Sequence, residues 1–201
     1  LLGRRDMNRY IFNECVYFGC DARNCLPEEL RKRGFKKVFL VTDETIIKCG
    51  VSEKITSIFD QNNIKYSVFS DIKPNPTTQN VKDGLKVLKK AKADVIVALG
   101  GGSVIDTAKA IAIIKENKEH ADVLSLAGAV ETKNRCFPLI AIPTTSGTAA
   151  EVTINYVITD ENTKRKLVCI DPHDVPIMSI VDSELMRTMP ASLTASTGMD
   201  A

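Results

Sequence analysis

The chain has 201 residues, of which 44% are hydrophobic and 26% charged, a composition typical of a globular protein. Its 27 lysine and arginine residues nearly balance its 25 aspartate and glutamate residues, so the net charge of +2 gives no reason to expect nucleic acid or an anionic membrane as partner. The apolar runs are only as long as strands, which excludes a membrane span within them.

Short apolar runs alternate with helix-like stretches along most of the chain. A first segment at 9–19 has strand propensity, and we expect it to form an edge hairpin. The main strands are predicted at 38–41, 66–69, 95–99, 139–142 and 177–181, and the helices between them at 27–33, 52–62, 78–90 and 103–115. Most of these runs lack alternation with polar residues, which is typical of strands buried on both faces. The pattern therefore predicts an α/β fold with an open, doubly wound parallel sheet.

Two further segments lie after the fourth main strand. A β-like pair is predicted at 151–159 and 164–170, on either side of a turn at 160–163. The sequence becomes helix-like from 183 onward.

The chain has six cysteines, and the first three follow one another at intervals of five residues, which is not the spacing of a zinc site. A chain of this size does not need disulfides to fold. We therefore expect reduced cysteines and a cytoplasmic protein.

A glycine loop, Gly100-Gly101-Gly102-Ser103, directly follows the predicted strand at 95–99. Glycines let a phosphate approach the backbone, and the helix that starts at Ser103 offers free N–H groups and the positive end of its dipole. A tight turn would need fewer glycines, so we favour phosphate binding. The loop is not the common G-x-G-x-x-G fingerprint, because Ile105 stands where its last glycine would be.

Asp106 and Lys109 follow this loop within the same predicted helix. Ser103 and Asp106 have the spacing of a capping box, and direct contact of Asp106 with a ligand is an equal alternative. We expect Lys109 to be the surface partner of Asp106 rather than a catalyst.

A hydroxyl-rich loop, Thr144-Thr145-Ser146-Gly147-Thr148, follows the strand at 139–142. Hydroxyl and backbone N–H groups can hold phosphate, ribose or an amide, although such loops are also common as plain turns. Its place beside the glycine loop, at the carboxyl ends of parallel strands, favours a ligand site.

Two more polar residues follow early strands. Asp43 comes after the strand at 38–41, where a carboxylate can accept both hydroxyls of an adenine ribose and repel a 2′-phosphate, which indicates NAD over NADP. The alternative for Asp43 is an N-cap of a helix that starts near Glu44. Asn75 stands between two prolines and is either aimed at the same cleft or part of a plain turn.

Three motifs together resemble the iron-containing (group III) alcohol dehydrogenase family. They are the Gly-Gly-Gly-Ser-x-x-Asp segment at 100–106, Pro-Thr-Thr-x-Gly-Thr-x-x-Glu at 143–151, and Gly-Met-Asp-Ala at 198–201. The resemblance starts near Tyr17 and covers nearly all the remaining chain. Segments 151–160 and 169–174 are most similar to the lactaldehyde reductase (propanediol oxidoreductase) branch of the family.

This resemblance implies a Rossmann-like NAD-binding domain over residues 1–184 and an NAD-dependent oxidoreductase of a short alcohol, diol or aldehyde. The adenosine end would contact Asp43 and Asn75, and the nicotinamide end Thr153, Val157 and Lys166. The other residues that the resemblance assigns to the cofactor are Gly101, Gly102, Ser103, Asp106, Thr144, Thr145, Ser146 and Thr148.

The resemblance also implies a divalent iron that acts as a Lewis acid, with Asp200 as its first protein ligand. The other ligands in this family are three histidines later in the chain. The present sequence ends one residue after Asp200, and its two histidines, His120 and His173, both precede it. We expect His173 to be a loop histidine held by Asp171 or Asp174. Residues 185–201 would then be the start of an all-helical metal-binding domain that is otherwise absent.

This chain alone is therefore expected to be inactive, and the alternative function is a stand-alone NAD-binding module without catalysis. A zinc-using polyol dehydrogenase or a dehydroquinate synthase relative is a further alternative. The parent is expected to be a homo-oligomer, such as a dimer, with the strand near 10–18 as a pairing edge.

Overall fold

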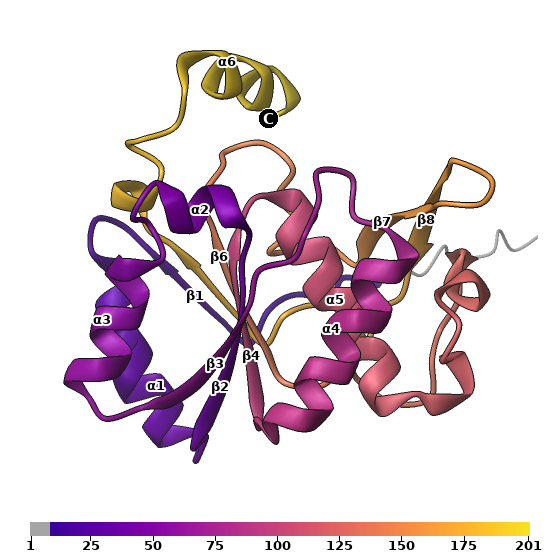
Figure 1. Ribbon diagram of the computed structural model, residues 1–201, viewed down its shortest axis with the longest axis horizontal. Coiled ribbons are helices and arrows are strands. Elements are labelled where there is room, and N and C mark those ends of the chain that lie inside the picture. The colour runs from indigo at the N-terminus through magenta and orange to yellow at the C-terminus, as the bar shows by residue number, and fades with distance from the viewer. Residues whose placement is uncertain (1–8) are drawn as a thin grey trace, which may run out of the picture.

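A six-stranded parallel sheet forms the centre of the protein, as seen in the computed structural model, which describes residues 9–201 (Figure 1). Its strands, in spatial order, are β1 (Cys15–Phe18), β9 (Met178–Val181), β6 (Leu139–Pro143), β4 (Val95–Gly100), β2 (Lys37–Val41) and β3 (Lys65–Phe69). All the pairings in this sheet are parallel. The predicted doubly wound parallel sheet is confirmed.

Helices cover both faces of the sheet (Figure 1). The side chains of β2 alternate between the two: Val38 and Leu40 pack with α1 (Leu26–Lys32) and α3 (Glu53–Gln61), whereas Phe39 and Val41 pack with α4 (Thr78–Ala91) and α5 (Gly102–Glu116). Strand β4 is buried along its whole length. Two covered faces explain why the apolar runs lack alternation with polar residues.

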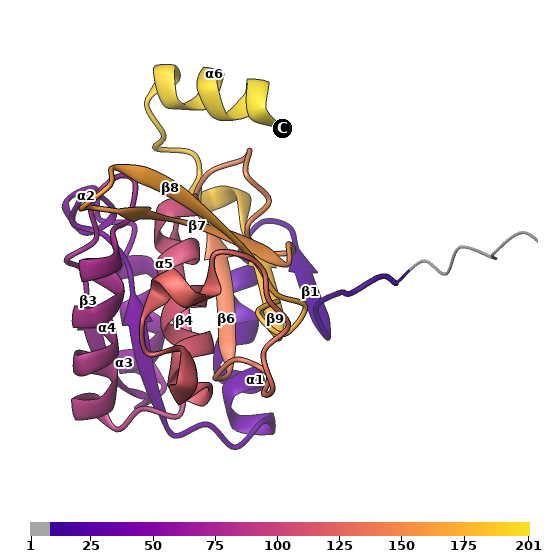
Figure 2. The ribbon, with the colours of Figure 1, turned by 90° about the vertical axis from the view of Figure 1, so that its right-hand side faces the viewer.

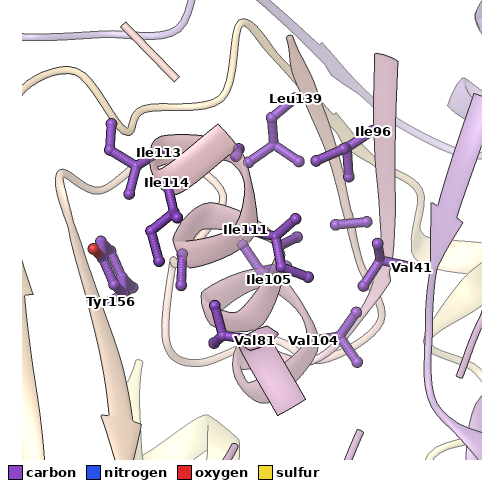
Figure 3. Close-up of a cluster of buried hydrophobic side chains, with 14 of the residues drawn as sticks. Val41, Val81, Ile96, Val104, Ile105, Ile111, Ile113, Ile114, Leu139 and Tyr156 are labelled. Atoms are coloured by element: carbon purple, nitrogen blue, oxygen red, sulfur yellow. The ribbon is translucent and has the colours of Figure 1, made fainter. Parts of the chain in front are cut away.

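A smaller three-stranded sheet covers the outer side of α5 (Figure 2). It consists of β5 (Gly128–Ala129), β8 (Arg165–Ile170) and β7 (Asn155–Asp160), and β7 and β8 form the predicted antiparallel pair. Figure 3 shows Tyr156 of β7 on one side of α5 and Ile96 and Val41 of the main sheet on the other. Helix α5 is thus enclosed, which explains why it is apolar on nearly every side.

The order of the strands contains a topological switch point. From β2 the chain moves outward to β3 and then crosses back to β4, after which it continues through β6 to β9. Strands β2 and β4 are therefore neighbours whose connections leave in opposite directions. In open α/β sheets the crevice at the carboxyl ends of such a pair is the usual ligand site.

The predicted edge hairpin at 9–19 is wrong. Only Cys15–Phe18 forms a strand, and it pairs in parallel with β9. The amide of Glu14 already donates to the carbonyl of Ile177, so this part of the chain joins the main sheet instead of folding back on itself. Strand β1 does lie at an edge of the sheet, as expected.

The remaining elements are short, and most of them connect the larger ones. They are α2 (Glu44–Lys48), η1 (Ala22–Cys25), η2 (Lys118–His120), η3 (Val123–Leu126), η4 (Ser183–Leu185) and α6 (Ala191–Asp200). The two last elements confirm the helix-like character expected from 183 onward. All six cysteines are free, as predicted. Within residues 9–201, no helix is long and apolar enough to cross a membrane.

Candidate functional site

A cleft of about 660 Å³ lies at the carboxyl ends of β2, β4 and β6. Helix α2 and the loop after β3 line one side, the start of α5 lines the centre, and the hydroxyl-rich loop after β6 lines the other side. The segment from η4 to α6 lies above it (Figure 1). The cleft is thus at the topological switch point, where the strand order alone would place a ligand.

The glycine loop allows two loops to approach each other closely. A Cβ atom on Gly101 would lie 3.2 Å from the Thr145 side chain, and one on Gly102 would lie 3.0 Å from that of Thr148. Gly101 is the N-cap of α5, and no side chain among residues 9–201 caps this helix. The first N–H groups of a helix have no partner within it, so this uncapped N-terminus can bind an anion. The site fits the diphosphate of a dinucleotide.

Asp43 lines the cleft and also caps α2, as the alternative prediction stated. Its Oδ1 accepts a hydrogen bond of 2.9 Å from the Ile46 amide. Capping and ligand contact are compatible, because a carboxylate has a second oxygen. Asn75 has a φ of 56°, and its neighbours Lys73 and Pro74 line the cleft whereas Asn75 does not. The positive φ is typical of a turn, and the contact of Asn75 with the adenosine end of the cofactor stays a prediction.

The hydroxyl-rich loop contributes Thr144, Thr145 and Thr148 to the cleft, whereas Ser146 is exposed and lies outside its lining. The amide of Thr144 donates to the carbonyl of Gly100, which joins this loop to the glycine loop. Three of the four hydroxyls expected at the site are therefore in place.

One alternative for Asp106 and the prediction for Lys109 are wrong. Asp106 does not cap α5, because its Oδ2 accepts a 3.0 Å hydrogen bond from the Val157 amide of β7, and its contact with a ligand stays a prediction. Burial raises the pKa of this carboxyl to about 6. Lys109 is not on the surface: it is fully buried, and its ammonium reaches the segment before β7. The sequence contained one signal of this, a lysine within a helix that is otherwise apolar on nearly every side.

The residues expected near the nicotinamide also lie outside the cleft lining. Thr153 accepts a hydrogen bond from Lys109 through its backbone carbonyl, and Val157 donates to Asp106. Lys166 is exposed on β8, opposite Thr159. The structure thus gives Thr153 and Val157 a connection to α5, and their predicted contact with a cofactor stays a prediction.

Residues after β9 also line the cleft, and no motif in the sequence predicts them. The carbonyl oxygen of Thr197 would be only 2.6 Å from a Cβ atom on Gly147, so α6 and the hydroxyl-rich loop are in close contact. No local motif marks this segment, because its contribution depends on where α6 folds over the sheet. The cleft-lining residues concerned are Leu185, Thr188, Met189, Pro190, Leu193 and Thr197.

Asp200, the predicted metal ligand, lies at the end of α6. Within residues 9–201, no three histidine, cysteine, aspartate or glutamate side chains gather in a way that could hold a metal ion. His173 is held in its loop, as expected: its amide donates to Asp171, and its Nδ1 lies 2.8 Å from the carbonyl of Thr132. The described residues therefore do not by themselves fit an iron site.

Comparisons with known proteins agree with the architecture. The chain is 49% identical to lactaldehyde reductase of Escherichia coli over 96% of its own length and 51% of that protein. Among solved structures, it matches a 1,3-propanediol oxidoreductase with a TM-score of 0.91 and 38% identity, over 97% of this chain and 50% of that one. It also matches sulfoacetaldehyde reductase from Bifidobacterium kashiwanohense, determined in complex with NAD+, with a TM-score of 0.87 and 29% identity over 97% and 51%.

The chain spans about half the length of these relatives. Residues 13–183 match the family described as iron-containing alcohol dehydrogenase. With this match and the parallel sheet that carries the cleft, the chain belongs to the iron-containing alcohol dehydrogenase family.

Proposed function

We propose that this chain binds NAD in the cleft and forms the cofactor-binding part of an oxidoreductase. The observation that carries the proposal is the convergence of three loops, after β2, β4 and β6, at the topological switch point around the uncapped start of α5. The NAD+ complex of the related sulfoacetaldehyde reductase supports it.

The positions of the three loops support one direction for the bound dinucleotide. Its diphosphate would lie at Gly101, Gly102 and Ser103, in the middle of the cleft. The adenine ribose would lie on the β2 side, where Asp43 can accept its hydroxyl groups and repel a 2′-phosphate. The nicotinamide half would therefore lie on the β6 side, beside the hydroxyl-rich loop.

The bound nicotinamide would supply the hydride chemistry, and the protein would hold and orient it. Thr144, Thr145 and Thr148 would donate or accept hydrogen bonds on that side of the cleft. We also propose that Asp200 contributes one ligand to a metal site that needs residues beyond those described here.

The substrate is proposed to be a short alcohol, diol or aldehyde, because the chain is 49% identical to lactaldehyde reductase. We further propose a cytoplasmic, dimeric parent enzyme, with β1 at the exposed edge of the sheet. Assays of the chain with iron, NADH and lactaldehyde distinguish catalysis from NAD binding alone: turnover would show that these residues suffice for catalysis.

Calorimetric titration with NAD+ tests the binding proposal. We expect the unmodified chain to bind NAD+ and Gly102→Val to weaken that binding about a hundredfold, because the added side chain would fill the space between the glycine loop and Thr148. Circular dichroism checks that the variant folds. The control is Gly198→Val, since a Cβ atom on Gly198 meets nothing within 4 Å. Absence of NAD+ binding by the unmodified chain, or unchanged affinity in Gly102→Val, would contradict the proposal.

A further inference from the structure

Lys109 is a charged residue in the middle of the protein. It lies two turns after Gly102 on α5 and is 0% exposed. Its neighbours Ala108, Ala110 and Ile111 all belong to the apolar cluster between the main sheet and β7. An ammonium group in such surroundings is costly unless its donors are satisfied, so its contacts indicate what it does.

The ammonium of Lys109 contacts a single short segment. It donates to the carbonyl of Thr153 at 2.5 Å and to the carbonyl of Asn155 at 3.1 Å, and it lies 3.3 Å from the hydroxyl of Thr153. A lysine has three donors, and the three contacts account for them. One turn earlier on the same helix, Asp106 accepts from the Val157 amide. Two charged side chains of α5 thus hold the beginning of β7.

The segment held in this way is the continuation of the hydroxyl-rich loop. Residues 144–154 form neither helix nor strand, so no regular ladder holds them in place. The segment is joined to the glycine loop at its start, by the hydrogen bond from Thr144 to Gly100. Near its end, Lys109 holds Thr153, and Asn13 donates to the carbonyl of Glu151 at 2.9 Å.

We propose that Lys109, assisted by Asp106, is a positioning residue for the nicotinamide half of the bound cofactor. Helix α5 would receive the diphosphate at its N-terminus and, through Lys109, fix the loop that contacts the far half of the dinucleotide. This inference rests on the proposed NAD function and on the direction in which the strand order places the dinucleotide. Lys109 touches neither substrate nor cofactor in this role.

The surrounding charges keep the ammonium able to donate. Burial lowers the pKa of Lys109, and the neighbouring carboxylates of Asp174 and Asp106 oppose that effect. Asp174 is itself fully buried, and neither of its carboxylate oxygens has a hydrogen-bond partner among the described residues. Burial raises the pKa of Asp174, and Lys109 opposes that effect, so each group favours the charged form of the other across the space between α5 and the loop before β9.

The test compares two ligands, because NAD+ contains the nicotinamide half and ADP ends at the diphosphate. We expect the unmodified chain to bind NAD+ more tightly than ADP. Lys109→Met should weaken NAD+ about tenfold and leave ADP within about twofold. It should also remove the change in nicotinamide fluorescence that accompanies NADH binding. A purely structural lysine would lower the melting temperature without changing the ratio of the two affinities, and that result would overturn the inference.

Lys115→Met is the matched control, because it makes the same chemical change on the same helix. The Lys115 ammonium lies 5.0 Å from the centre of the Phe137 ring, away from residues 144–154. The ratio of NAD+ to ADP affinity in Lys115→Met should equal that of the unmodified chain. If that chain binds neither ligand, the proposed function fails and the inference fails with it. If it binds both equally, only the inference fails.

A second variant serves if Lys109→Met does not fold. Asp106→Ala removes the acceptor of the Val157 amide and leaves Lys109 in place. We expect the ratio of NAD+ to ADP affinity to fall about threefold, in the same direction as for Lys109→Met. An unchanged ratio in folded Asp106→Ala would overturn the inference.

Discussion

The two sides of the cleft are held in place by different means. On the β2 side, Asp43 caps a helix through an amide three residues away, and Asn80 donates to the carbonyl of Asp71, nine residues away. On the β6 side, the carbonyl of Thr153 accepts from Lys109, 44 residues away, and the carbonyl of Glu151 accepts from Asn13, 138 residues away. These contacts of the β2 side are local, whereas those of the β6 side depend on the completed fold.

Among changes that affect only one side of the cleft, the largest expected effect comes from Gly147, where the β6 side contacts α6. A side chain here would meet the backbone carbonyl of Thr197, and a backbone atom cannot move as easily as the end of a flexible side chain. We expect Gly147→Val to weaken NAD+ about tenfold or more and to leave ADP binding nearly unchanged. Calorimetry with both ligands measures this. Equal weakening of both ligands would show that the two sides are not independent.

Asp43 tests the β2 side with a smaller effect. Asparagine caps a helix about as well as aspartate, so Asp43→Asn should keep the stability of the protein, whereas Asp43→Ala should lose about 1 kcal/mol. Removing the charge should improve the affinity for NADP+ relative to NAD+ about fivefold in both variants. Thermal unfolding and calorimetry separate the two roles. If Asp43→Asn rejects NADP+ as strongly as the unmodified chain, Asp43 does not select the cofactor.

The smallest effect concerns the buried carboxyl of Asp106. Because burial raises its pKa to about 6, protonated Asp106 favours the folded state, and this contribution is lost as the pH rises through about 6. The melting temperature of Asp106→Asn minus that of the unmodified chain should therefore rise between about pH 4 and about pH 6 and level off at higher pH.

Asp83 provides the control for this measurement. Hydrogen bonds from Gln79 and Lys86 lower the pKa of Asp83, so it stays ionised over the same range and Asp83→Asn should give a flat difference. A flat difference for Asp106→Asn as well would mean that the Asp106 carboxyl does not titrate in this range.

The contrast between the two sides also explains what the sequence could predict. The buried strand β4, the glycine loop after it and the Asp43 cap follow from residues that are close together in the chain, and each was predicted. The pairing of Cys15 with Met178 and the burial of Lys109 are set by segments far apart in sequence. No local pattern determines the pairing of Cys15, and the apolar residues around Lys109 in α5 were the one local sign of its burial. The edge hairpin and the surface lysine were therefore predicted wrongly.

The candidate site divides along the same line. The glycines and threonines of the two loops, Gly101, Gly102, Thr144, Thr145 and Thr148, line the cleft, as predicted. Asp106 on α5 instead bonds to Val157 of β7, and Thr153 bonds to Lys109 of α5, because β7 folds back over α5. The residues of α6 carry no motif of their own and became part of the site only through the close contact at Gly147.

The contact between Gly147 and Thr197 also has a consequence for affinity. A ligand in the cleft would contact two attachment points at once, the loops of the main sheet and the segment that leads into α6. Its affinity would depend on how close the second part lies once the first part is bound, as for a bivalent ligand. Because Gly147 has no side chain, α6 rests directly on the loop, and less conformational entropy would be lost when a ligand contacts both parts. Gly147 would therefore raise affinity without touching the ligand.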